Sequence, residues 1–375
     1  MAMTESTPTV GKHVIIPKDG LQSVFDSLMS AGYIILGPTI DQEAIVYETM
    51  ENITELPVGW TDDQGPGQYR IRQRDDGKFF GYVVGPSTWK KYLYPPELTL
   101  FSCQQLDGEL QFETKQEVSK FALVGVRGCE LAAIGIQYRI LLEGLYQDPH
   151  YRNRREQAFI LAVNCTEPGE TCFCTSMKSG PRCDSGFDLA LTELPDSFLL
   201  EVGSELGAEM LLKSSWKHAG AFDLNQATKL LDQAENHMGR SMETSDLPEL
   251  LYTNLDSKRW DIVSQRCLSC TNCTIVCPTC FCTDVLDTSD LTGQQTERKR
   301  VWDSCFSSDF SYVHGGNTRP NIRSRYRQWL THKLASWSDQ FGELGCTGCG
   351  RCITWCPVGI DLTEEISAIR EGGLV

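Results

Sequence analysis

Two runs of cysteine share one spacing and are the residues of this chain best suited to chemistry. The first run is Cys267-x2-Cys270-x2-Cys273-x3-Cys277-Pro278, and the second is Cys346-x2-Cys349-x2-Cys352-x3-Cys356-Pro357. Together they contain eight of the 17 cysteines. This spacing is the iron–sulfur signature of ferredoxins that hold two clusters. We therefore predict two [4Fe–4S] clusters.

The same spacing predicts which thiolates each cluster takes. Three cysteines on one tight loop can reach three iron corners of a [4Fe–4S] cube, and the fourth ligand comes from the Cys-Pro position of the other run. The predicted ligands of the first cluster are Cys267, Cys270, Cys273 and Cys356. The predicted ligands of the second cluster are Cys346, Cys349, Cys352 and Cys277. This exchange joins two distant segments of the chain.

Zinc and disulfides explain the two runs less well. A zinc site needs only two Cys-x2-Cys pairs, which leaves the third cysteine of each run and the matching Cys-Pro unexplained. Disulfide-dense scaffolds are typically small and secreted, whereas a chain of 375 residues can bury a large core. The thiols of the two runs are therefore interpreted as iron–sulfur ligands.

Length and charge limit the class of protein. A chain of 375 residues with 41% hydrophobic residues predicts two or three globular domains. A formal net charge of −16 argues against nucleic acid as a partner. The N-terminal residues lack the pattern of a secretory signal, and no stretch reaches the ~18 apolar residues of a membrane span. We expect a cytoplasmic protein without a membrane span, because the cytoplasm keeps thiols reduced for cluster assembly.

Five further cysteines follow the strands of a predicted βαβ unit. Strand-like runs at 121–126 and 158–163 flank a stretch with helical periodicity at 131–145. The two strands of such a unit are parallel, so Cys129 and Cys165 should meet just beyond their carboxyl ends. Open α/β sheets favour that edge for ligand sites. The loop that follows adds Cys172, Cys174 and Cys183.

Four of these five thiols could hold a third cluster. We select Cys129, Cys165, Cys172 and Cys174 as its ligands and leave Cys183 as the spare. In the alternative interpretation, Cys129 and Cys165 are small core residues, and only the loop cysteines bind anything.

The remaining polar groups give weaker indications. Cys280, Cys282 and Cys305 lie between the two runs and either adjust cluster potentials or simply pack, since they have no clear fourth ligand. The basic stretches at 152–155 and 319–327 suit an oxyanion, although a solvated or ion-paired surface is the commoner explanation. None of the six histidines lies in a His-Glu-x-x-His motif, and no Gly-x-Gly-x-x-Gly follows a strand. We therefore assign no catalytic residue and no flavin or nicotinamide site.

The surrounding elements predict two domains. We expect an α/β domain over residues 1–240, which carries the third iron–sulfur site, and a dicluster domain over residues 241–375. Within the first domain, apolar spacing predicts a helix at 19–29. A turn containing Asp-Gly predicts a hairpin that pairs 69–74 with 79–84.

The connection between the cysteine runs indicates the type of ferredoxin domain. Small β-type ferredoxins join their runs by a short connection, but here 68 residues separate Cys277 from Cys346. Helical periodicity at 325–336 lies within this connection. We therefore expect an α-helical, ferredoxin-like dicluster domain. A further helix at 223–239 should act as a spacer or packing element before it.

The order and context of these motifs resemble one protein family. The motifs are Arg127-Gly128-Cys129-Glu130, Cys165, Cys172-Phe173-Cys174, Gly186-Phe187-Asp188, the first run continued as Pro278-Thr279-Cys280-Phe281-Cys282, Trp302-Asp303-Ser304-Cys305, Gly315-Gly316 and the second run. Over residues 121–360 the chain resembles the iron–sulfur beta subunit of cytoplasmic sulfhydrogenases and NAD(P)-linked [NiFe] hydrogenases. It is similar also to the electron-input subunit of anaerobic sulfite reductase, a member of the same family. The motif ending at Cys305 and the motif Gly186-Phe187-Asp188 favour the hydrogenase branch, whereas Cys183 favours the sulfite reductase branch.

The resemblance implies an electron-transfer subunit that is not itself catalytic. In such hydrogenases a flavoprotein subunit reacts with NAD(P), nickel–iron subunits handle hydrogen, and the beta subunit supplies a relay of clusters. In the sulfite reductase branch, the partner would be a sirohaem subunit. The resemblance also implies a helical type of ferredoxin domain. A redox sensor is a third hypothesis, disfavoured because no DNA-binding segment or effector domain is recognisable in the sequence.

Overall fold

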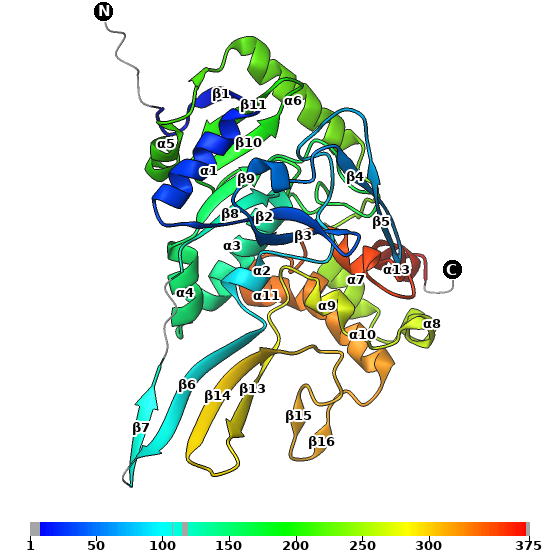
Figure 1. The fold of residues 1–375 in the computed structure, drawn as a ribbon. Coiled ribbons are helices and arrows are strands. Elements are labelled where there is room, and N and C mark those ends of the chain that lie inside the picture. Colours follow the sequence, from blue (N-terminus) through cyan, green and yellow to red (C-terminus); the bar gives the residue numbers. More distant parts are fainter. Residues whose placement is uncertain (1–7, 107, 115–118, 373–375) are drawn as a thin grey trace, which may run out of the picture.

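A large mixed sheet forms the N-terminal part of the computed structural model, which describes residues 8–106, 108–114 and 119–372. Its strands are β1 (His13–Pro17), β2 (Ile34–Asp41), β3 (Ala44–Thr49), β8 (Phe121–Val126), β9 (Phe159–Val163), β10 (Leu189–Glu193), β11 (Ser197–Val202) and β12 (Lys217–His218). They lie in the order β12-β1-β11-β10-β9-β8-β2-β3. Figure 1 shows this sheet in the upper half of the molecule.

The centre of the sheet is parallel, and its edges are antiparallel. β8 pairs in parallel with β2 and β9, and β9 pairs in parallel with β10. All five residues of β9 are buried, as expected for a strand covered on both faces. The predicted βαβ unit is confirmed, because α3 (Gly128–Leu142) and α4 (Pro149–Glu156) connect β8 to β9. Cys129 therefore lies in the first turn of α3, and Cys165 follows β9.

Other helices of this region also match their predicted positions. α1 (Gly20–Ser30) buries Leu21, Val24, Phe25 and Leu28, which recur at helical spacing. α6 (Ala221–Asn236) buries Ala227, Leu231 and Ala234. The short elements η1 (Ile53–Glu55), α2 (Lys90–Leu93) and α5 (Glu205–Leu211) complete the region.

The predicted hairpin of 69–74 with 79–84 is wrong. β5 (Gln68–Gln73) pairs instead with β4 (Trp60–Gly65), the strand before it. Backbone amides of the 79–84 stretch donate to side-chain carboxylates, two of them to Glu193 and one to Asp62. Since these amides are already paired, the stretch has little capacity left for a strand ladder.

Helices dominate the C-terminal part, as predicted. They are α7 (Leu247–Thr253), α8 (Arg259–Arg266), α9 (Asn272–Ile275), α10 (Ile322–Thr331), the π-helical turn η2 (His332–Ser336), α11 (Trp337–Phe341), α12 (Arg351–Thr354) and α13 (Leu362–Arg370). α10 and η2 confirm the helix predicted at 325–336. A separate apolar core lies between these helices and includes Trp260, Tyr326, Trp329 and Leu330.

A four-stranded sheet that the sequence did not predict combines segments from both sides of residue 240. β6 (Glu97–Leu106) and β7 (Glu109–Glu113) join β13 (Thr283–Ser289) and β14 (Gln295–Trp302) in the order β13-β14-β6-β7. This sheet extends away from the rest of the molecule at the bottom of Figure 1. A small ribbon of β15 (Tyr312–Val313) and β16 (Gly316–Asn317) lies nearby.

Candidate metal centres

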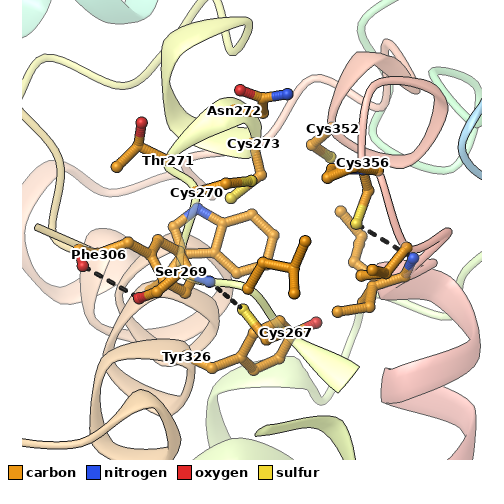
Figure 2. A pocket seen from close by; sticks show the side chains of 16 residues that line it. Cys267, Ser269, Cys270, Thr271, Asn272, Cys273, Phe306, Tyr326, Cys352 and Cys356 are labelled. Carbon is orange, nitrogen blue, oxygen red and sulfur yellow. Dashed lines mark hydrogen bonds between the residues drawn. The ribbon is translucent and has the colours of Figure 1, made fainter. Parts of the chain in front are cut away.

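The first cysteine run wraps around a pocket (Figure 2). Five cysteines line it: Cys267, Cys270, Cys273, Cys352 and Cys356. The structure thus places the Cys-Pro residue of the second run beside the first. Ser269 and Thr271 allow the tight turn by adopting left-handed conformations with φ angles of 54° and 68°.

Backbone amides point at the sulfurs of this pocket. The Ser269 amide donates to Cys267 Sγ with an N···S distance of 3.4 Å, and the Ile360 amide donates to Cys356 Sγ at 3.3 Å. Hydrogen bonds of this kind stabilise thiolate ligands and influence the cluster potential. Burial raises the pKa of the Cys273 thiol well above its ordinary value. A metal must therefore displace the proton when this residue becomes a ligand.

The rest of the first pocket is aromatic. Phe306, Tyr326 and Trp329 line it, and their ring centroids lie 5.4 to 6.1 Å apart. None of the described residues that line this pocket is charged. Cys270 is exposed, so the site is shielded by rings on one side and reaches the surface on the other.

The second run turns tightly at two glycines. Gly348 and Gly350 have φ angles of 64° and 75°, and the Gly348 amide donates to Cys346 Sγ at 3.5 Å. Burial, together with the nearby Cys277 sulfur, raises the pKa of Cys346 to about 12, although the Lys333 ammonium opposes this shift. Burial also raises the pKa of Cys352, and the nearby sulfurs of Cys346 and Cys277 raise it as well. The structure thus brings Cys277 to the second run.

A buried ammonium group lies against these thiols. Lys333 Nζ is 3.4 Å from Cys277 Sγ. Burial opposes the charge of Lys333, but the sulfurs of Cys277 and Cys280 outweigh it and hold the pKa of the ammonium well above its ordinary value. The second group of thiols therefore has a positive neighbour.

The thiols of the predicted third site line one further pocket. They are Cys129, Cys165, Cys172 and Cys174. Cys183, the spare, lines a different pocket and packs in the core of the large sheet. Burial raises the pKa of Cys174 to about 12. At this site too, a metal must therefore displace the proton before the thiol can bind as a thiolate.

A buried arginine shows that the third pocket suits an anionic group. Arg127 lines the pocket and is 6% exposed. Its Nη2 donates to the carbonyls of Phe80 and Tyr82, each at 3.0 Å, whereas its Nε is buried without a hydrogen-bond partner. No ion pair to its guanidinium occurs among the described residues. A cluster held by four thiolates carries net negative charge, which would offset this buried cation.

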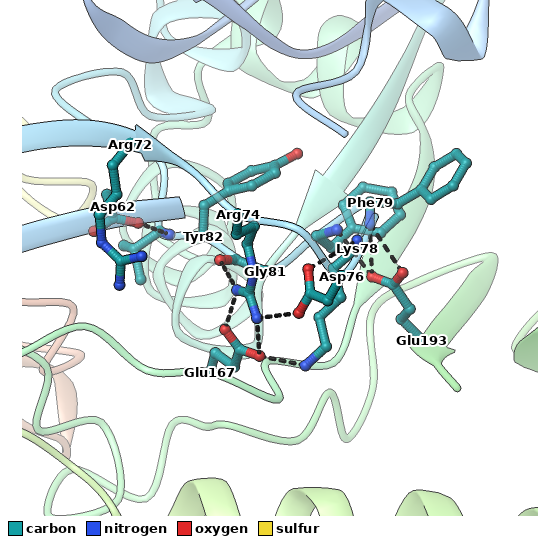
Figure 3. Close-up of polar contacts among 12 residues, drawn as sticks. Asp62, Arg72, Arg74, Asp76, Lys78, Phe79, Gly81, Tyr82, Glu167 and Glu193 are labelled. Carbon is teal, nitrogen blue, oxygen red and sulfur yellow. Dashed lines mark hydrogen bonds and ion pairs between the residues drawn. The ribbon is translucent and has the colours of Figure 1, made fainter. Parts of the chain in front are cut away.

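Polar contacts fix the loop that carries the third-site cysteines. Glu167, two residues after Cys165, binds Arg74 and Lys78 (Figure 3). At the other end of the loop, Thr171 Oγ1 lies 2.7 Å from Thr354 Oγ1. These contacts hold the loop against both the β4–β5 hairpin region and α12.

The three groups of thiols adjoin one another. Cys352 belongs to the second run but lines the first pocket, and Cys349 belongs to the second run but lines the third pocket. Cys172 Sγ is also 3.8 Å from the Cys349 carbonyl oxygen. The second group therefore lies between the other two.

Comparisons with known proteins identify a domain and a family for this chain. The model of the 4Fe-4S dicluster domain matches residues 266–360. The chain is 34% identical over 373 residues to sulfhydrogenase 2 subunit beta of Pyrococcus furiosus. The aligned region covers 96% of this chain and 99% of the relative. The chain belongs to the sulfhydrogenase beta-subunit family. No solved structure gives a significant match.

Membership in the sulfhydrogenase beta family confirms the family resemblance in the sequence. This member is an iron–sulfur electron-transfer subunit, and its dicluster domain implies two [4Fe–4S] clusters. No helix in the described part of the chain is long and apolar enough to cross a membrane.

A cluster needs more widely spaced thiolates than a single metal ion does. Among the described residues, no group of three or more His, Cys, Asp or Glu side chains could hold one metal ion. A single zinc ion, with Zn–S bonds of about 2.3 Å, would draw its thiolates to within about 4 Å of one another. The thiolates of a cube bind different iron atoms and lie farther apart, so the thiol groups described above remain compatible with clusters.

Sequence reasoning missed a buried ion pair between α3 and α12. Arg351 Nη2 lies 2.9 Å from Glu130 Oε1, and the two side chains are 4% and 1% exposed. Tyr47 donates to the other carboxylate oxygen at 2.7 Å. Arg351 also lines the third pocket. The only signal in the sequence was Glu130 within the family motif, since nothing local connects it to a residue 221 positions away.

The remaining candidates have ordinary structural contacts. The Cys305 side chain interacts with Cys282 and lowers the pKa of the Cys282 thiol to about 7. In the basic stretch at 319–327, Arg323 pairs with Asp261 at 2.8 Å, as expected for an ion-paired surface. The stretch at 152–155 lies on α4, where Arg152 is near Glu156.

Proposed function

We propose that this chain relays electrons through [4Fe–4S] clusters between a flavin-containing, NAD(P)-reactive subunit and a [NiFe] hydrogenase module. The proposal rests on membership in the sulfhydrogenase beta family and on the adjoining groups of thiols. When bound, the clusters would supply one-electron transfer. We further propose that the chain works in the cytoplasm, where thiols stay reduced.

The residues of the chain hold, shield and charge-balance the clusters. We propose Cys267, Cys270, Cys273 and Cys356 for the first cluster and Cys346, Cys349, Cys352 and Cys277 for the second. We propose Cys129, Cys165, Cys172 and Cys174 for a third cluster, with the charge of Arg127 as support. The single observation that carries the relay is the position of Cys349 and Cys352, each of which belongs to one group and borders another.

Iron and acid-labile sulfide analysis of anaerobically prepared protein tests the cluster count. About twelve iron atoms per chain support three cubes, and about eight support only the dicluster pair. Cys129→Ser should remove about four iron atoms, whereas Cys183→Ser, the matched control, should remove none. Zinc in place of iron would refute the cluster proposal as a whole, and equal iron in Cys129→Ser and the parent protein would remove that residue from the ligand set.

Isolation of the native complex tests the proposed partners. The chain, affinity-tagged at its own locus and purified without oxygen, should bring down nickel and flavin in amounts comparable to itself. A complex with sirohaem and without nickel would instead identify the chain as the electron-input subunit of a sulfite reductase. Recovery of the chain alone, with full activity, would exclude both assignments.

A further inference from the structure

Lys333 is a buried cation on an irregular helical turn. It is 3% exposed and belongs to η2, the π-helical turn between α10 and α11. π-Helical turns widen a helix locally and occur frequently at functional sites. Here the turn accompanies the burial of a lysine between the two cysteine runs.

The contacts of Lys333 leave its charge without a carboxylate. Its Nζ donates to the Gly345 carbonyl at 2.9 Å, to Thr279 Oγ1 at 3.0 Å and to Cys277 Sγ at 3.4 Å. No ion pair to Lys333 is found in the described ranges of the chain. A fully buried ammonium requires a negative partner to offset its lost hydration. The thiolate of Cys277, as a ligand of an anionic cluster, would be that partner.

A second buried lysine approaches the same segment from the N-terminal region. Lys90, on α2, donates from Nζ to the carbonyls of Cys280 at 3.1 Å and Thr274 at 3.3 Å. The same ammonium lies 4.0 Å from the centre of the Trp302 ring. Two cations thus flank the chain around Cys277.

The pocket of the first run has no equivalent charge. Its described lining is uncharged, and three of its walls are the rings of Phe306, Tyr326 and Trp329. The hydrogen bonds to its sulfurs come from the backbone amides of Ser269 and Ile360. The two cysteine runs share a spacing, but their electrostatic surroundings differ.

We propose that Lys333 raises the redox potential of the cluster bound by Cys277 and the second run. This cluster is then easier to reduce than the cluster of the first run. This inference rests on the clusters of the proposed function. Reduction adds one electron to a cluster, and a fixed positive charge with a hydrogen bond to a ligand sulfur stabilises the added charge. Of the two dicluster sites, the second is therefore the one that takes an electron first.

Redox titration followed by electron paramagnetic resonance tests this assignment. The anaerobic, cluster-loaded protein is titrated as the parent, as Lys333→Met and as Lys333→Arg. Lys333→Met should lower the midpoint of one dicluster signal and leave the other nearly unchanged, and Lys333→Arg should restore most of the shift. The signal that moves should be the one altered in Cys346→Ser and unaltered in Cys267→Ser. Lys91→Met serves as the control, because Lys91 is exposed, pairs with Glu48 and lies next to Lys90 in the sequence.

Three results would overturn the proposal. They are unchanged midpoints in a Lys333→Met protein with full iron content, equal shifts of both signals, and a shift confined to the first-run cluster. If Lys333→Met fails to assemble, Thr279→Val decides, because it removes the hydroxyl that accepts from Lys333 and lies 3.2 Å from Cys277 Sγ. That variant should give a smaller shift in the same direction, and no shift would refute the proposal.

This outcome is separable from the proposed function. The titration uses mediators and needs no partner subunit, so a wrong identification of the partners leaves the predicted shift intact. The predicted shift of the midpoint also holds if the third cluster is absent. Conversely, a normal complex with nickel and flavin is compatible with unchanged midpoints in Lys333→Met, which would refute only the role of Lys333.

Discussion

Removal of Arg351 should destabilise the protein through the carboxylate that it leaves behind. In Arg351→Met, the donors left to Glu130 among the described residues are the Tyr47 hydroxyl at 2.7 Å and the Arg127 amide at 3.3 Å. The carboxylate is 1% exposed, so water cannot replace the lost guanidinium. Breaking a buried ion pair by deleting one partner typically costs about 3–5 kcal/mol. We expect a loss of this size.

Removal of the carboxylate should cost less. In Glu130→Gln, the remaining cation of Arg351 still faces the sulfurs of Cys349 and Cys129. Anionic clusters at those sulfurs would offset the unpaired charge. We therefore expect a loss of roughly 1–3 kcal/mol, the range for a buried hydrogen-bonding group that loses its partner. In Arg351→Met with Glu130→Gln, no unpaired charge remains, and the combined loss should be smaller than the sum of the two single losses.

Thermal unfolding of the anaerobic, cluster-loaded protein measures these differences. For a chain of 375 residues, 1 kcal/mol shifts the midpoint by about 1.3 °C, so Arg351→Met should melt roughly 4–6 °C below the parent. The exposed pair Arg298 and Asp287 provides a control, because neutralising it should change the midpoint by no more than about 2 °C. Additive losses in the double variant, or a larger loss in Glu130→Gln than in Arg351→Met, would contradict the reasoning.

Three further predictions follow from local features. Gly348→Ala should lose iron and melt far below the parent, because its Cβ would lie 2.5 Å from the Phe173 carbonyl oxygen; Gly342→Ala, which has a similar φ and nothing within 4 Å, should lose only the ~1–2 kcal/mol of a left-handed backbone. Burial raises the pKa of Asp62 from 3.8 to about 6, so the unfolded chain loses this proton at a lower pH than the folded chain does. The free energy of unfolding should therefore fall by up to about 3 kcal/mol as the pH rises between these values. The thermal midpoint of Asp62→Asn should not show this fall, and parallel profiles of thermal midpoint against pH for the variant and the parent would contradict the prediction. Chelation of the iron should make the 266–360 region the first to be cut in limited proteolysis, and initial cleavage within the large sheet would argue against clusters as its stabilising element.

The local patterns of the sequence predicted most of the elements near the candidate sites. The spacing of the two runs depends on loops of a few residues, and the parallel pairing of β8 with β9 follows from a short apolar strand, a helix and a second apolar strand. For the same reason, Cys129 and Cys165 could be expected at one edge of the sheet. The helix at 325–336 was visible in its periodicity, although its π-helical end was not.

Features that depend on distant segments were not predictable from one sequence. β14 contains four consecutive charged residues, 297–300, so nothing in it indicates a pairing with β6 almost 200 positions earlier. The stretch at 79–84 has the composition of a strand, but the carboxylates of Asp62 and Glu193 take its amides. Lys333 looks like an ordinary surface lysine in sequence, because its burial depends on how α10 packs between the runs.

The contacts between the two halves of the chain suggest why a relay would need both. The Phe173 amide, in the third-site loop, donates to the Gly348 carbonyl of the second run at 2.8 Å. The Glu130–Arg351 ion pair joins the same two regions nearby, and β6 pairs with β14 farther away. Electron transfer requires redox centres held at fixed separations and shielded from water. Since the second run touches the first pocket through Cys352 and the third through Cys349, a change in how the halves pack would alter all three sites together. We therefore regard the interface between the halves as part of the proposed relay, and not as a linker between an independent ferredoxin and its support.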